Sequence, residues 1–158
     1  MDTRTCHKGQ VIFRQNDDGQ CMYCVQYGKV GIFLDYGGPD EVMLAELMSD
    51  QFFGEMGLLE HLPRSATAVA LTDDTVIETI TEEGFDSYFE ENPAKVLMLL
   101  QQMCSRLRRT TRDYLRACST VREEVETEKT GKPRSKSLLK RIADYCELFR
   151  SMGSASIN

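Results

Sequence analysis

The chain has 158 residues, of which 41% are hydrophobic and 28% charged, a balance that fits one globular domain with an extension. Its longest apolar run is five residues, which excludes a membrane-spanning helix, and its N-terminus lacks the apolar stretch of a signal peptide, so we expect a cytoplasmic protein. The formal net charge of -6 argues against nucleic acid as the main partner, because binding a phosphate backbone usually needs a basic face.

Short strands predominate in the first half of the chain, each bounded by turn-forming residues. The clearest turns are the cluster at 16–19 and the loop at 36–40, where glycine can adopt a positive φ. Evenly spaced short strands of this kind favour a β-sandwich or a β-roll. The predicted strands include residues 22–27, 30–34, 41–47, 65–71 and 75–81.

Six cysteines are spread through the chain, and scattered cysteines in a cytoplasmic protein are usually reduced. Cys21 and Cys24 have a spacing found in metal sites, but they fall in a predicted strand. Residues three apart in a strand face opposite sides of the sheet, so we favour a structural role over a metal or iron–sulfur site. The six are Cys6, Cys21, Cys24, Cys104, Cys118 and Cys146.

The pattern changes near residue 82 from strands to helices. Residues 81–93 predict a short helix stopped by Pro93, and a long helix is predicted from near residue 94 to about 127. Its apolar residues alternate in steps of three and four, a heptad seam that favours a parallel homodimer through residues 94–125. The seam comprises Val96, Leu100, Met103, Leu107, Thr110, Tyr114, Ala117 and Val121.

Two polar features of this helix have more than one interpretation. The hydroxyl of Thr110 either bonds back to its own helix or meets a ligand at the seam, and position alone does not decide. A basic face on the same helix is most simply a solvated surface, with nucleic-acid binding as the alternative. The basic residues are Arg106, Arg108, Arg109, Arg112 and Arg116.

The C-terminal part of the chain is expected to be an appendage to this helix. Residues 128–137 predict a polar linker, because they contain a glycine and a proline. Residues 138–150 have apolar side chains at helical spacing and predict a short amphipathic helix. A flexible tail is expected at 151–158.

Residues 53–70 carry the strongest functional signal. Gly54 opens a predicted helix, and the N–H groups and dipole at a helix start suit an anion. Glu55 can accept hydrogen bonds from sugar hydroxyls, and Arg64, at the head of the next predicted strand, supplies a planar clamp for phosphate. Phosphate plus ribose is the simplest ligand that uses all three.

The segment Phe53-Gly-Glu-Met-Gly-Leu-Leu, followed by Pro63-Arg-Ser-Ala-Thr, resembles the phosphate-binding cassette of the cyclic nucleotide-binding domain family. The likeness covers about residues 6–118 and is greatest to the catabolite-activator type of bacterial regulator. It implies a mainly β fold with flanking helices, a double-stranded β-helix or jelly-roll-like β-roll followed by a long dimerisation helix. The cyclic nucleotide-binding domain would occupy residues 1–118.

The resemblance also implies a role for each site residue. Glu55 would accept a hydrogen bond from the ribose 2′-hydroxyl, Arg64 would pair with the cyclic phosphate, and Ser65 would donate its hydroxyl. Thr110 and Thr111 fall at two hydroxyl positions that contact adenine, which favours cAMP, although Ser65 is also compatible with cGMP. The other expected site residues are Gly54, Met56, Gly57 and Ala66 in the cassette and Ile32, Leu44 and Leu47 along the apolar wall.

Two departures from the family pattern matter. Asp50 stands in a loop that usually contains glycine, so it must tolerate a left-handed backbone. The segment after residue 127 is too short for a helix-turn-helix domain, so we expect a protein partner for residues 138–150 and no direct DNA binding. No enzyme constellation is present around His7 or His61.

We therefore expect a regulatory domain that binds cAMP or cGMP, acts as a dimer, and has neither enzymatic activity nor a metal. Three alternatives stay open. One is a ligand-independent dimerisation or interaction module that keeps the fold without the ligand. The others are a nucleic-acid regulator and a cysteine-based redox or iron–sulfur sensor.

Overall fold

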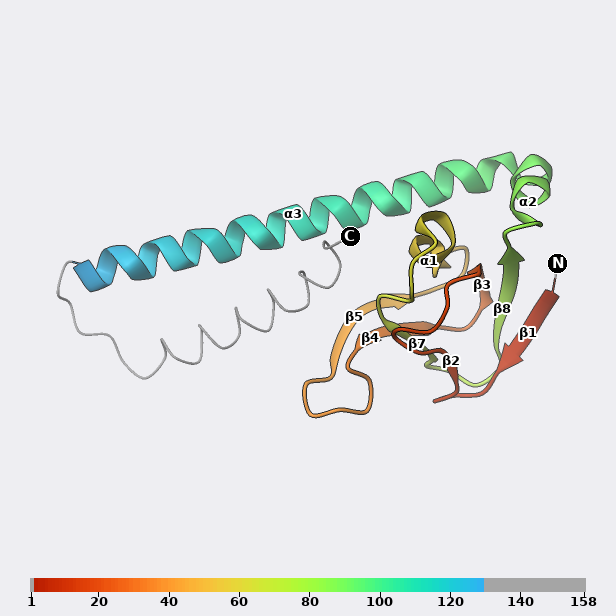
Figure 1. Cartoon of the computed structure of the whole chain (residues 1–158), viewed down its shortest axis with the longest axis horizontal. Coiled ribbons are helices and arrows are strands. Elements are labelled where there is room, and N and C mark those ends of the chain that lie inside the picture. The colour runs from red at the N-terminus through yellow and green to blue at the C-terminus, as the bar shows by residue number, and fades with distance from the viewer. Residues whose placement is uncertain (1, 130–158) are drawn as a thin grey trace. The chain divides into compact units, whose positions relative to one another are not determined.

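The computed structural model describes residues 2–129 and divides the chain into two compact units, Met1–Gln102 and Met103–Asn158. Eight strands lie in the first unit (Figure 1). They are β1 (Asp2–Cys6), β2 (Val11–Phe13), β3 (Cys21–Tyr27), β4 (Val30–Leu34), β5 (Val42–Leu47), β6 (Phe52–Phe53), β7 (Thr67–Ala70) and β8 (Thr75–Thr81). They form two antiparallel sheets, in the orders β1-β8-β3-β6 and β2-β7-β4-β5, which confirms the predicted β-roll.

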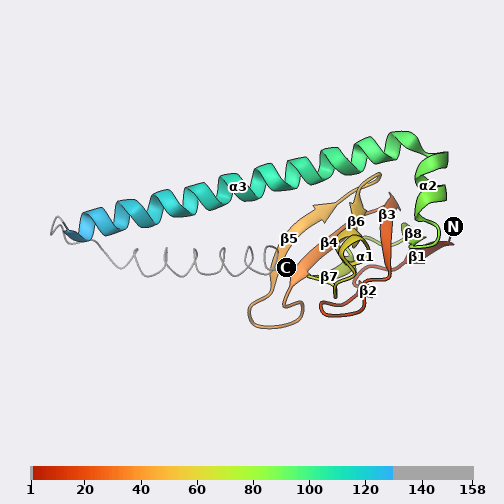
Figure 2. The ribbon, with the colours of Figure 1, turned by 45° about the horizontal axis from the view of Figure 1, so that its top comes forward.

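Three helices accompany the sheets. The first, α1 (Glu55–Glu60), lies against β3 (Figure 2). The second, α2 (Phe85–Glu91), follows β8 and ends before Pro93, as predicted. The third, α3 (Pro93–Lys129), is the predicted long helix. Within residues 2–129, no helix combines the length and the apolar character that crossing a membrane requires.

The long helix extends slightly further than expected. The described part of the helix includes residues 128 and 129, which therefore do not belong to the predicted linker. The rest of that linker, the amphipathic helix at 138–150 and the tail at 151–158 lie outside the described residues.

Two apolar clusters lie on opposite faces of β3, because side chains alternate along a strand. The first contains Tyr23 and Val25 and draws at least one buried residue from each of the eight strands, so it fills the interior of the roll. The second contains Met22 and Cys24 and lies under α2 and the start of α3. Cys21 packs against the first cluster and Cys24 belongs to the second, which confirms that the two cysteines face opposite ways.

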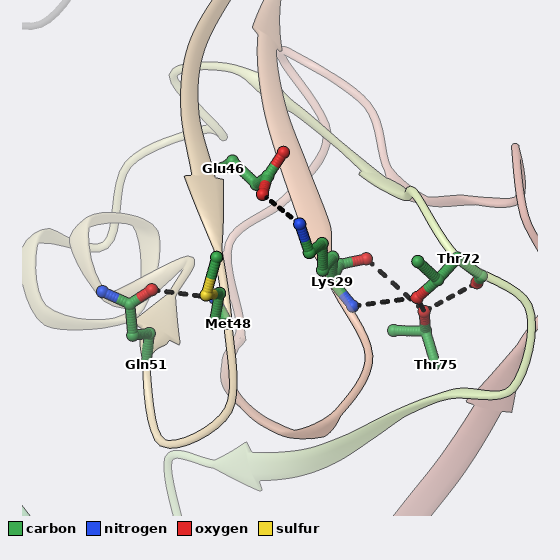
Figure 3. Close-up of polar contacts among 6 residues, drawn as sticks. All are labelled: Lys29, Glu46, Met48, Gln51, Thr72 and Thr75. Carbon is green, nitrogen blue, oxygen red and sulfur yellow. Dashed lines mark hydrogen bonds and ion pairs between the residues drawn. The ribbon is translucent and has the colours of Figure 1, made fainter.

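Two tight turns frame β4 and β5 (Figure 3). Gly28 has φ of +81°, and a Cβ there would lie 2.6 Å from the Thr75 hydroxyl, so this position needs glycine. The Lys29 N–H donates to the Thr72 hydroxyl at 3.1 Å, and the hydroxyls of Thr72 and Thr75 are 2.9 Å apart. Across the strands, Lys29 Nζ forms a 2.7 Å ion pair with Glu46.

The second of these turns contains the unusual Asp50. Its φ is +64°, so the residue adopts the left-handed conformation that the sequence required of it. The Met48 N–H donates to Gln51 Oε1 at 2.8 Å (Figure 3). The Asp50 N–H donates to the Val25 carbonyl at 2.8 Å, which fixes the turn against β3 just before the cassette.

Polar contacts attach α2 and the start of α3 to the first sheet. Lys95 Nζ donates to the Tyr88 hydroxyl at 2.7 Å, and that hydroxyl donates to Glu78 Oε2 at 3.0 Å. Gln102 forms two further hydrogen bonds with the backbone of Phe52. The first turns of α3 are therefore part of the compact unit that contains the roll.

Candidate functional site

Gly54 opens the helix of the cassette, as predicted. Gly54 has φ of +76° and precedes α1, whose first residue is Glu55. An added Cβ at Gly54 would lie 2.7 Å from Nη1 of Arg64, so both the backbone conformation and the close guanidinium require glycine. Since α1 has only six residues, its dipole is small, and the anion chemistry of the site depends mainly on Arg64.

Arg64 lies just before β7 and is only 3% exposed. Its Nη1 donates to the Gly54 carbonyl at 2.7 Å, and its Nη2 contacts Cys21 Sγ at 3.5 Å. The guanidinium carbon lies 4.4 Å from the centre of the Phe13 ring and 5.7 Å from that of Tyr23. Cation–π contact with these rings stabilises the desolvated guanidinium.

One donor of this guanidinium has no partner. The Nε of Arg64 is fully buried and makes no hydrogen bond. Nε and Nη2 lie on the same edge of the guanidinium plane, and two donors on one edge match the two oxygens of a phosphate or carboxylate. Leaving a charged donor buried and unsatisfied costs free energy, so this edge is suited to an anion.

The backbone of Arg64 is held by the turn that follows β2. Its N–H donates to the Asp17 carbonyl at 2.8 Å, and its carbonyl accepts from the Asn16 N–H at 2.9 Å. Asn16 has φ of +70°, a conformation that asparagine adopts more readily than most residues. Arg64 is a buried cation and not a surface residue.

The other cassette residues differ in exposure. Glu55 is 3% exposed, which is uncommon for a carboxylate. Gly57 and Ala66 are also buried, whereas Ser65 and Met56 are exposed. The cassette thus presents the Ser65 hydroxyl on the outside and keeps the carboxylate and the guanidinium within the fold.

A close contact between two glycines lies beside the Arg64 guanidinium. An added Cβ at Gly19 would lie 2.6 Å from Cα of Gly57, and one at Gly57 would lie 2.9 Å from Cα of Gly19. The loop before β3 and helix α1 therefore meet backbone to backbone. From the sequence, Gly19 was predicted only as a turn residue, because its contact, Gly57, lies 38 positions further along the chain.

The expected apolar wall is formed in part. Leu47 is buried in the roll, paired with Val30, and the half-buried Ile32 packs against the same cluster. Ile32 pairs with Ala45, and the register then shifts, so that Phe33 pairs with Met43. Ala45 packs against the core, whereas Leu44 falls at the irregularity and is half-buried.

Thr110 and Thr111 lie on α3 within the unit Met103–Asn158. Thr110 is half-buried and Thr111 is exposed. Because they belong to a different compact unit from the cassette, their contact with the base of a ligand stays a prediction.

The thiol and phenol beside Arg64 form a small polar group inside the roll. Cys21 Sγ donates to the Tyr23 hydroxyl at 3.1 Å. The pKa of Tyr23 is raised to about 12, chiefly by burial and secondly by this hydrogen bond. The phenol therefore stays protonated near neutral pH. Among residues 2–129, no group of three or more histidine, cysteine, aspartate or glutamate side chains is arranged to hold a metal ion.

Known proteins are similar to this chain in sequence. Residues 3–92 match the sequence profile of the family described as "Cyclic nucleotide-binding domain". The chain is 38% identical over 101 residues to the Cyclic AMP receptor protein of Thermus thermophilus, covering 64% of this chain and 46% of that relative. It is 33% identical over 85 residues to the cAMP-dependent protein kinase regulatory subunit of Debaryomyces hansenii, covering 54% and 18%. The aligned part of the chain thus spans less than half the length of these relatives.

Solved structures show the same fold. The crystal structure of the Thermus thermophilus Catabolite Activator Protein superposes with a TM-score of 0.63 at 27% identity, covering 97% of this chain and 77% of that one. The EAL enzyme Bd1971 in its halfsite-occupied form has a TM-score of 0.52 at 31% identity, covering 70% and 97%. Bd1971 is also known in a cAMP bound form and a cGMP bound form.

Proposed function

Because the chain belongs to the cyclic nucleotide-binding domain family, we propose that it binds a cyclic nucleotide, cAMP in preference to cGMP, at the cassette of residues 53–66. The observation that carries the proposal is the buried Arg64, whose Nε has no hydrogen-bond partner. A cyclic phosphate carries one negative charge and two exocyclic oxygens. It would satisfy the Nε–Nη2 edge with two parallel charge-assisted hydrogen bonds.

The other contacts of the Arg64 guanidinium leave its Nε–Nη2 edge available to a phosphate. Nη1 is already bonded to the Gly54 carbonyl, which orients the guanidinium without using its Nε–Nη2 edge. Nη2 has only a 3.5 Å contact with the Cys21 sulfur, a weak acceptor. Replacing that contact by a phosphate oxygen would therefore stabilise the complex, since only a weak interaction with sulfur is lost.

The rest of the cassette has groups suited to the sugar. The Glu55 carboxylate can accept hydrogen bonds from a ribose hydroxyl, and the exposed Ser65 hydroxyl can donate to the phosphate from the solvent side. The preference for cAMP depends on Thr110 and Thr111 meeting the adenine. Bd1971 binds either nucleotide, so the family alone does not decide the base.

The proposed action is regulatory and not enzymatic. Large apolar residues of the heptad seam are exposed on α3, among them Leu100 at 53% and Leu107 at 69%, and a second copy of the chain would bury them. Ligand binding would shift the equilibrium between two arrangements of the dimer. A protein partner that binds residues 138–150 would respond to this shift. The five described cysteines are free thiols, which supports a cytoplasmic location.

Calorimetric titration of cAMP and of cGMP into the full chain tests the proposal. Arg64→Gln should weaken binding more than tenfold, the effect of losing about 1.5–3 kcal/mol of charge-assisted hydrogen bonding. Arg64→Lys keeps the charge and loses the two-donor edge, so it should fall between Arg64→Gln and the unchanged chain. Arg14→Gln is the matched control, because Arg14 is exposed on the adjoining turn.

Circular dichroism must first show that each variant is folded. Equal affinity in a folded Arg64→Gln protein would contradict the assignment of the phosphate to Arg64. An absence of heat and of thermal stabilisation with both nucleotides would contradict the function itself and leave the ligand-independent dimerisation module.

A further inference from the structure

We propose that Cys21 is an oxidation site for hydroperoxides, and that its sulfenic acid takes the edge of Arg64 that a cyclic phosphate would use. The inference rests on the proposed function, because it concerns control of the same site. It makes the domain responsive to two signals, a cyclic nucleotide and a peroxide, that exclude each other at one guanidinium.

The first observation is the position of the thiol. Cys21 Sγ lies 3.5 Å from Nη2 of Arg64 and 3.1 Å from the Tyr23 hydroxyl, at the start of β3. Cys21 as a residue is partly exposed and lies at the start of its strand, so we expect a small oxidant to reach the thiol. Cys6 and Cys24, by contrast, are fully buried, and burial raises the pKa of the Cys24 thiol, which keeps it in the unreactive protonated form.

The second observation is independent of the thiol. Arg64 is 3% exposed, and its Nε, on the same guanidinium edge as Nη2, lacks an acceptor. Thiol sulfur is a weak acceptor, but an oxygen attached to that sulfur is a strong one. Since Nη2 already contacts the sulfur, a new S–O bond would place an acceptor within reach of this edge.

The chemistry needs one equivalent of hydroperoxide. The sulfur attacks one peroxide oxygen, an S–O bond forms and the O–O bond breaks. With hydrogen peroxide, the departing oxygen takes up the thiol proton and leaves as water. The sulfur is oxidised by two electrons, the peroxide is reduced by two, and the product is Cys21 sulfenic acid, which thiols can reduce again.

Competition then follows from geometry. The Nε–Nη2 edge has two donors and can hold one anion or one pair of acceptor oxygens at a time. Sulfenic acid is tethered at this edge, so its effective concentration there is high. A cyclic nucleotide would have to displace it before Arg64 could pair with the phosphate.

The test uses the full chain with Cys104→Ser, Cys118→Ser and Cys146→Ser, so that these three thiols cannot contribute. Protein with Cys21 and protein with Cys21→Ser are treated with hydrogen peroxide. Dimedone labelling and peptide mass spectrometry then quantify sulfenic acid at Cys21, and calorimetry measures the affinity for cAMP and cGMP.

Oxidation should weaken nucleotide binding at least tenfold in the Cys21 protein, and dithiothreitol should restore it. The Cys21→Ser protein should bind like the reduced protein before and after peroxide. Unchanged affinity in protein that is fully labelled at Cys21, or an absence of labelling at Cys21, would overturn the proposal.

A second readout does not depend on nucleotide binding. In nucleotide-free protein, oxidation should raise the melting temperature, because the sulfenic oxygen gives the buried Arg64 donor an acceptor. The rise should be absent in Cys21→Ser and in Arg64→Gln. If the reduced protein binds neither nucleotide yet shows this rise, the proposed function fails while the oxidation site stands; a fall in melting temperature overturns the oxidation site.

Discussion

Gln102 and Phe52 are joined by two hydrogen bonds that imitate a strand pair. The Phe52 N–H donates to Gln102 Oε1 at 2.9 Å, and Gln102 Nε2 donates to the Phe52 carbonyl at 2.7 Å. Phe52 lies in β6, an edge strand of two residues that pairs on its other side with β3. The side-chain amide of α3 thus takes the place of the next strand, directly before Phe53 and Gly54.

Replacing Gln102 should loosen both the fold and the site. In Gln102→Ala the buried backbone of Phe52 loses both bonds, so we expect unfolding to become easier by about 1–3 kcal/mol. Urea unfolding measures this loss, and amide exchange at Phe52 should become faster. The neighbouring Gln101 is exposed, so Gln101→Ala is the matched control and should change neither quantity. Equal stability of the two variants would mean that the amide pair contributes nothing.

Gly54 should tolerate alanine poorly. Gly54→Ala would force a Cβ to within 2.7 Å of the Arg64 guanidinium at φ of +76°. Gly37 has φ of +79° with no atom within 4 Å of an added Cβ. Gly37→Ala therefore measures only the loss of stability from placing alanine at a positive φ, about 1 kcal/mol. We expect Gly54→Ala to be clearly less stable than Gly37→Ala in urea, and also weaker in nucleotide binding. Equal losses would mean that Arg64 moves aside without cost.

Tyr23 should make stability fall in alkaline solution. Its pKa is about 12 in the folded protein and close to 10 when unfolded, so the unfolded chain loses its proton first as pH rises. The contribution is complete below pH 10 and is lost as pH rises towards 12, at up to about 1.4 kcal/mol per pH unit. Tyr23→Phe should reduce this slope in urea unfolding between pH 9 and 11. Tyr27 is 64% exposed, so Tyr27→Phe should leave the slope unchanged.

The heptad seam should hold two chains together. Leu107 is 69% exposed at the middle of the seam, and a charge there would have to be buried in a dimer. We expect Leu107→Glu to convert the dimer to monomer in sedimentation equilibrium. Arg108→Glu, one position further along and off the seam, should stay dimeric. A chain that is monomeric before substitution, with or without nucleotide, would refute the dimer.

Features that depend on residues adjacent in the sequence could be predicted from it. Gly54 opening a helix, Pro93 separating two helices and the alternation around Cys21 and Cys24 each depend on local backbone geometry, and each was confirmed. The left-handed Asp50 followed from comparing one loop with the family pattern, and its φ of +64° agrees.

Features that join distant residues were not predictable. The amide pair between Phe52 and Gln102 links positions 50 apart, and a glutamine on a helix is ordinarily read as solvated. The inward contact of Arg64 with Cys21 depends on the turn after β2. The register shift between β4 and β5, after which Phe33 pairs with Met43 and which places Leu44 at the irregularity, was also not predicted, because an irregularity of one residue leaves little signal in the sequence.

The contact between Gly19 and Gly57 limits the directions in which the cassette can travel. The two backbones already touch, since a single added carbon at either position would lie less than 3 Å from the other. Helix α1 therefore has no room to approach the loop before β3. Any rearrangement of α1 on binding must carry it away from that loop or along it, because the glycine pair blocks closer approach.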